Sequence, residues 1–99
     1  MKSTINNALY ALHHGSSVTT TYKDIEFTIF ACETDIHYYV NTGWYGRKKD
    51  FATCKDLIKP FTISYDHWEE EELWSLKGIL TKEKLIQFLD QTGFLDIDM

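Results

Sequence analysis

The first hydrophobic pattern along the chain is helical. Apolar residues near the N-terminus recur at intervals of three and four, which places Ile5, Ala8, Leu9 and Leu12 on one face of a helix. Gly15 follows this run, and glycine readily takes the left-handed conformation that ends many helices. The pattern therefore predicts a helix that ends just before Gly15.

A second pattern, alternation of apolar and polar residues, predicts strands. Residues 23–32 alternate, and residues 36–42 continue the alternation after a short turn, so these two segments are expected to form an antiparallel hairpin. Residues 61–65 alternate as well and predict a third strand. Two further segments fit either an edge strand or irregular structure: the Ser- and Thr-rich residues 16–21 and the tail 95–98.

Three more segments carry helix signals. Residues 51–58 show helical spacing of apolar residues and are followed by Pro60, which would end a helix. Residues 66–78 begin with a capping-box spacing and close on glycine, and residues 81–93 begin with a threonine N-cap. The predicted order is α-β-β-α-β-α-α. It describes a single small α+β domain over residues 1–99, with helices on one face of an antiparallel sheet of three to four strands.

The composition excludes several classes of protein. The 99 residues suit one domain, and 43% hydrophobic with 15% aromatic residues argue against intrinsic disorder. Two cysteines are too few for a disulfide scaffold, and no apolar run approaches the roughly 20 residues that a membrane-spanning helix needs. The N-terminus lacks the apolar core of a secretory signal, so we expect a cytoplasmic protein with reduced thiols and no membrane contact.

Acidic charge is concentrated in the last third of the chain. Residues 1–65 hold seven basic and six acidic residues, whereas residues 66–99 hold three basic and nine acidic residues. Consecutive glutamates there lie between two indole side chains, which predicts a partner-binding strip that contacts a basic protein surface. The alternative is the first turn of a solvated helix, with both indoles in the core. The residues of this strip are Trp68, Glu69, Glu70, Glu71, Glu72 and Trp74.

A second candidate surface combines aromatic and basic residues. Trp44, Tyr45, Arg47 and Lys48 lie within five positions, and Lys49 follows them. Aromatic rings stack on nucleic-acid bases and cations hold phosphates, so this patch would suit direct nucleic-acid binding. It would equally suit an acidic groove on a protein, because Trp and Arg are favoured interface anchors. The alternative is a strand end with one packed ring and a solvated basic turn.

Signals for catalysis and metal binding are weak. The chain has no nucleophile-elbow, phosphate-loop, zinc-protease or CxxC motif. A helix would point the adjacent His13 and His14 about 100° apart, and Cys32 and Cys54 lack the close spacing of metal ligands. A Cys54–His67 or a Cys32–His37 pair would suit an activated thiolate, but nothing in the sequence orients either pair. We therefore expect no enzymatic activity, no cofactor and no metal.

These observations favour a binding protein. We expect a small acidic inhibitor or adaptor that blocks a nucleic-acid-processing enzyme by contacting the basic cleft of that enzyme. Abundant Ile, Lys and Asn are typical of an AT-rich genome, so the expected source is a low-GC bacterium, or a phage or mobile element living in one. In a phage or mobile element, the expected role is of the anti-CRISPR or anti-restriction type. The alternatives are a nucleic-acid-binding module that uses Trp44–Lys49, an immunity-type protein, and an oligomeric structural protein. A homodimer is compatible with the inhibitor.

Overall fold

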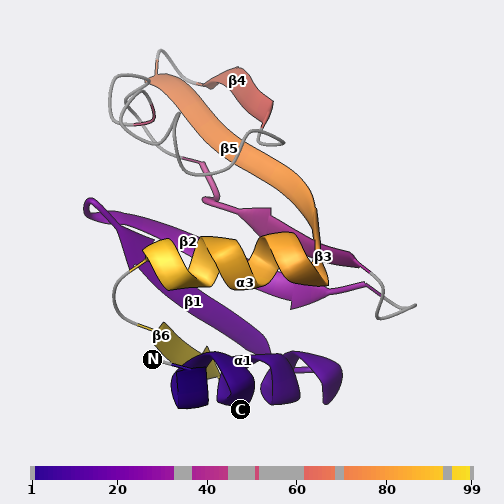
Figure 1. Cartoon of the computed structure of the whole chain (residues 1–99). Coiled ribbons are helices and arrows are strands. Elements are labelled where there is room, and N and C mark those ends of the chain that lie inside the picture. The colour runs from indigo at the N-terminus through magenta and orange to yellow at the C-terminus, as the bar shows by residue number, and fades with distance from the viewer. Residues whose placement is uncertain are drawn as a thin grey trace.

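Two helices lie on one face of a six-stranded antiparallel sheet in the computed structural model (Figure 1). The structure describes residues 2–32, 37–44, 51, 62–68, 71–92 and 95–98. The predicted α+β class and the antiparallel sheet are confirmed. The described elements are α1 (Lys2–His13), β1 (Ser17–Tyr22), β2 (Ile25–Ala31), β3 (His37–Asn41), β4 (Thr62–Trp68), β5 (Glu71–Thr81), α3 (Lys82–Gln91) and β6 (Leu95–Asp98).

The strands are arranged across the sheet in the order β4-β5-β3-β2-β1-β6. The pairs β1–β2 and β2–β3 join neighbours in the sequence, whereas β3–β5 and β1–β6 join segments that are far apart. The predicted hairpin of residues 23–32 and 36–42 is confirmed as β2 and β3. β2 begins only at Ile25, because Lys23 and Asp24 form the preceding turn with positive φ angles of 48° and 68°, as a type I′ turn requires.

The structure corrects the predicted strand count and element order. The sheet has six described strands rather than three to four, because residues 17–22, 71–81 and 95–98 contribute the additional strands β1, β5 and β6. Residues 66–68 and 71–78, the described part of this segment, form no helix and instead belong to the hairpin of β4 and β5. The predicted order α-β-β-α-β-α-α is therefore wrong. Of the predicted helix 51–58, only Phe51 is described, which is helical and buried; the other residues of that segment lie outside the described part.

The hydrophobic core lies between the helices and the sheet. α1 contributes Ile5, Ala8 and Leu12, and the predicted apolar face of α3 is confirmed by three buried side chains. The rings of Phe27 and Phe88 meet edge to face with centroids 5.2 Å apart, which joins β2 to α3. Each fully buried side chain of this size contributes about 1.5–3 kcal/mol of transfer free energy. The sheet side of the core comprises Val18, Ile25, Phe27, Ile29, Tyr38, Val40, Leu76 and Leu80.

Two predicted helix boundaries are confirmed. Gly15 has a φ of +85°, the left-handed conformation expected just after α1. Thr81 is the N-cap of α3, and its hydroxyl oxygen accepts a hydrogen bond from the Lys84 backbone N–H over 3.3 Å. These caps define the C-terminal end of α1 and the N-terminal end of α3, while the shared core holds both helices on the same face.

Candidate functional site

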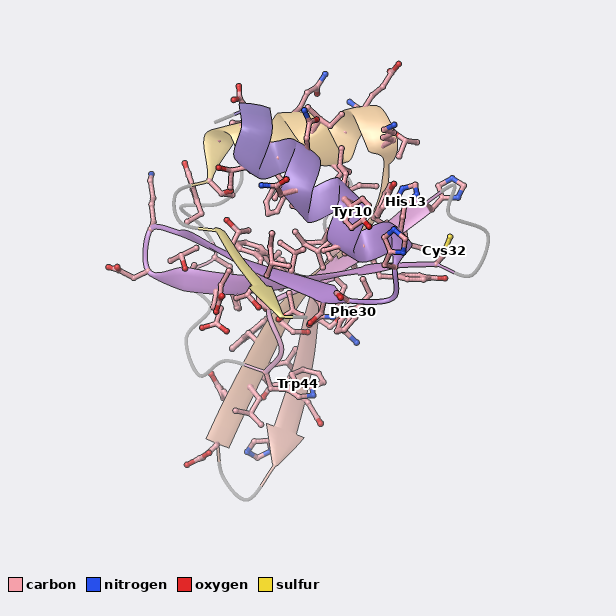
Figure 2. The ribbon with its side chains drawn as sticks, turned by 90° about the horizontal axis from the view of Figure 1, so that it is seen from below. Tyr10, His13, Phe30, Cys32 and Trp44 are labelled. Carbon is pink, nitrogen blue, oxygen red and sulfur yellow. The ribbon has the colours of Figure 1, made fainter. Side chains whose placement is uncertain are left out.

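The hairpin of β4 and β5 extends beyond the rest of the sheet. Only residues 77–81 of β5 pair with β3, whereas residues 71–76 pair with β4 alone among the described strands. We call this extension, residues 62–76 of the chain, the acidic arm. Figure 2 shows the arm leaving the sheet on the side away from the helices. It contributes to the elongated shape of the molecule, 42 × 24 × 22 Å.

The acidic arm carries the whole net charge of the protein. Between Thr62 and Leu76 the sequence holds five acidic residues, Asp66 and Glu69–Glu72, and no Lys or Arg. The remaining ten acidic residues equal the ten basic residues of the chain, so the net charge of −5 arises from this one hairpin. Clustered charge on a projecting element creates a directional field, which attracts a basic partner over about one Debye length of 8 Å at physiological salt.

An aromatic pair stiffens the arm. Tyr65 and Trp74 lie opposite each other on β4 and β5, and their ring centroids are 4.5 Å apart. Trp74 is half-buried, while 48% of Tyr65 is exposed. Cross-strand aromatic pairs stabilise hairpins, so this contact holds the acidic residues in a fixed frame.

The predicted acidic strip is placed on a hairpin rather than on a helix. Glu71 and Glu72 are both exposed and, as neighbours in a strand, point to opposite faces of the arm. Trp74 lies two residues further along β5, and Trp68 is the last residue of β4. Glu69 and Glu70 lie outside the described residues, as does the side chain of Trp68. Sequence reasoning left out Asp66 and Tyr65, which share the arm with the strip.

Of the predicted basic patch, the structure describes Trp44. The chain reaches it from β3 through Thr42, whose hydroxyl oxygen accepts a hydrogen bond from the Leu76 N–H over 2.9 Å. The Trp44 ring is 49% exposed, and the Lys77 ammonium lies 5.5 Å from its centroid. This cation–π contact adds a basic residue that sequence reasoning did not include. Tyr45, Arg47 and Lys48 lie outside the described residues.

An apolar row crosses the face of the sheet opposite the helices, which we call the outer face. Phe30 pairs with Tyr39, and Tyr39 pairs with Ile79, so the three side chains form a row on neighbouring strands. Their exposed fractions are 44%, 48% and 55%. Figure 2 shows Phe30 and Trp44 on this side of the molecule. The sequence alone did not identify which aromatic side chains would be exposed, and it is the strand pairing that places Phe30 and Tyr39 together on the outer face.

An open groove of about 550 Å³ adjoins this apolar row. Among its described lining residues, only Lys77 carries a charge. The groove therefore offers apolar walls, uncharged hydrogen-bonding groups and one cation to a ligand. The uncharged residues that line the groove include Tyr39, Asn41, Thr62, Ser64 and Ile79.

Within the described part of the chain, the histidine and cysteine side chains do not converge. The His13 Nε2 atom and the Tyr38 hydroxyl are hydrogen-bonded over 2.7 Å, while the His14 ring packs on Tyr10 with centroids 4.2 Å apart. The Cys32 Sγ atom accepts a hydrogen bond from the His37 backbone N–H over 3.3 Å, so this contact does not involve the imidazole. Among the described residues, no three His, Cys, Asp or Glu side chains gather as metal ligands would.

No protein-family model, curated protein or solved structure matches this chain. The described part of the chain has no helix that is both long and apolar enough to cross a membrane. The geometry and charge of the acidic arm and of the outer face are therefore the basis for a functional proposal.

Proposed function

We propose that this chain is a protein-binding inhibitor or adaptor that contacts a basic, nucleic-acid-binding cleft of its partner through the acidic arm. One observation carries the proposal: the entire net charge of −5 comes from a single projecting hairpin. A nucleic-acid enzyme holds its substrate by phosphate contacts, and a row of carboxylates competes for the same Lys and Arg side chains. Blocking that cleft would inhibit the enzyme.

The shape of the arm supports this role. A hairpin enters a cleft more readily than a flat sheet face does, and Asp66, Glu71 and Glu72 are exposed on it. Exposed Tyr65 adds a rigid aromatic anchor beside these carboxylates. Charge would govern the association rate and its salt dependence, while the aromatic contact would slow dissociation. The anti-CRISPR, anti-restriction and immunity roles all require such a surface, and the identity of the enzyme would separate them.

Capture of the partner from a lysate of the native host tests the proposal. The tagged protein is used at low and at high salt, beside a variant with Glu69–Glu72 changed to Lys. We expect stoichiometric, salt-sensitive recovery of a nuclease, helicase or related enzyme with the native protein and none with the variant. Equal recovery of that enzyme by both proteins would contradict a role for the arm. A stable oligomer without any partner would instead favour the structural alternative.

The outer face supports a second candidate, a nucleic-acid-binding module. Exposed Trp44 lies beside Lys77, and exposed Tyr39 lines the neighbouring groove. Rings next to a cation suit the stacking of bases and the neutralisation of phosphates. The chain continues from Trp44 into Arg47, Lys48 and Lys49, which would extend the same surface.

A gel shift with single-stranded DNA and RNA separates this candidate from the inhibitor. The module predicts a shift at micromolar protein and low salt that weakens as salt rises and is lost in Trp44→Ala and Arg47→Glu. Tyr10→Ala is the control, because Tyr10 is 64% exposed but lies on α1. Absence of a shift at low salt would contradict the module.

A further inference from the structure

The two edges of the sheet differ in how well they are protected against an additional strand. β6 has four residues, two of which are Asp96 and Asp98. β4 has seven residues, one carboxylate at Asp66, and no Lys, Arg or Pro. Short length and charge prevent strand addition at natural sheet edges, so β6 is protected and β4 is much less so.

β4 is accessible as well as unprotected. β5 is the only described strand that pairs with it. Ile63 and Tyr65 are 43% and 48% exposed, and Thr62, Asp66 and His67 are exposed too. Alternate backbone N–H and C=O groups of an edge strand point away from its neighbour and can hydrogen-bond to another strand.

The register of the arm specifies what an added strand would meet. On one face, Ile63 and Tyr65 continue the apolar layer of Leu76 and Trp74, to which they pair. Beyond them on this face, His67 pairs with Glu72. On the other face lie the polar side chains of Thr62, Ser64 and Asp66, of which Thr62 pairs with Lys77, so Asp66 is the carboxylate that would meet a basic residue of the added strand. Since successive side chains of an added strand alternate between these faces, apolar residues would suit the first face and basic residues the second.

We infer that β4 binds an extended segment of the partner by strand addition, and that this segment alternates apolar with basic residues. The inference rests on the proposed function, because it assigns a chemistry and a binding mode to the same partner. Charge favours this occupant over a second copy of the chain, since each arm already carries five carboxylates and no basic residue. Backbone hydrogen bonds would supply the affinity and the alternating side chains the specificity.

Peptide binding followed by amide exchange tests the inference. The probe is an eight-residue peptide of alternating Val and Lys, and the control is a block peptide of four Val followed by four Lys, with equal charge and composition. We expect the alternating peptide to bind about tenfold more tightly than the block peptide and to slow exchange of the β4 amides. Equal affinity of the two peptides without protection of β4 would overturn strand addition.

Proline variants locate the hydrogen bonds. Adjacent strand residues point their N–H groups in opposite directions, so of Ser64→Pro and Tyr65→Pro one removes an outward donor and the other disrupts pairing with β5. The variant that keeps the native circular dichroism spectrum should lose about tenfold in affinity for the alternating peptide. Unchanged affinity in that variant would overturn the inference.

A charge variant separates the failure of strand addition from the failure of the proposed function. If both peptides bind equally and Glu71→Lys/Glu72→Lys abolishes binding, the acidic arm binds by charge and strand addition is wrong. If the alternating peptide protects β4 equally in that variant, strand addition holds and the charge-based function is wrong. No binding of either peptide at about 1 mM, or β4 protection that appears only as the protein self-associates, would also overturn the inference.

Discussion

Phe27 and Phe30 lie three residues apart on β2, yet their environments are opposite. Phe27 is fully buried against Phe88, whereas Phe30 is 44% exposed on the outer face beside Tyr39. A strand of period two sends these side chains to different faces, so one belongs to the core and the other to a candidate binding surface. Residue type alone would not distinguish them.

Alanine substitutions at these two positions test the assignment of the faces. Phe27→Ala should lower the free energy of unfolding by about 3–5 kcal/mol, because it leaves a cavity in the core. Phe30→Ala should lower it by about 1 kcal/mol or less, since only cross-strand contacts are lost. Urea unfolding measures both values. If Phe27→Ala does not fold, Phe27→Leu and Phe30→Leu should keep the same ranking; equal losses would contradict the two faces.

At the residue scale, burial was largely predictable from the sequence. Strand alternation placed Ile25, Phe27 and Ile29 on one face, and all three are buried. Helical spacing likewise identified the buried face of α3. The exposed row on the outer face was not predicted, because it exists only where β3 and β5 bring Tyr39 and Ile79 beside Phe30. That pairing depends on contacts between distant segments, which a local pattern does not contain.

At the element scale, the acidic segment is the main difference between prediction and structure. Residues 66–78 have the capping residues and glutamates of a helix, yet residues 66–68 and 71–78 belong to β4 and β5. Leu76 and Leu80 are buried on one face of β5, and Trp74 pairs with Tyr65 of β4 across the hairpin. Strand preference depends on such cross-strand and same-face neighbours, so packing here outweighs local helix propensity.

A double-mutant cycle on Tyr65 and Trp74 tests the hairpin directly. In a helix over residues 66–78 the two rings would not meet, whereas in the hairpin their centroids are 4.5 Å apart. Tyr65→Ala, Trp74→Ala and the double variant should therefore show a coupling of about 0.5–1.5 kcal/mol in the free energy of unfolding. As a control, the cycle of Tyr10 with Trp74 should show no coupling. No coupling between Tyr65 and Trp74 would contradict the hairpin.

Connections between neighbouring elements were more predictable than those between distant ones. The β2–β3 hairpin followed from two alternating segments and a short turn. β6 pairs with β1, although the two strands are separated by most of the chain length. β5 pairs with β3, although part of β5 was predicted to be helical. Local sequence patterns specify periodicity and turns, but they do not identify which distant strand is the neighbour.

At the scale of the whole molecule, the excess of acidic residues falls on the segment of the chain that contains the projecting hairpin of β4 and β5. The body of the protein is electrically balanced, and its net charge of −5 is confined to the acidic arm. The sequence already showed an acidic last third, but it did not show that Asp66, Glu71 and Glu72 are exposed on one projecting hairpin. That coincidence of charge and projection is the central basis for a charge-guided protein interaction.

The most direct test of this account measures the affinity for the captured partner at two salt concentrations, with two charge-matched variants. Glu71→Lys/Glu72→Lys changes the arm, and Glu26→Lys/Asp90→Lys makes the same net change at exposed positions on β2 and α3. We predict that the arm variant loses about tenfold or more in affinity at low salt and most of its salt dependence, while the body variant stays close to the native protein. Equal losses in both variants, or none in the arm variant, would contradict the account.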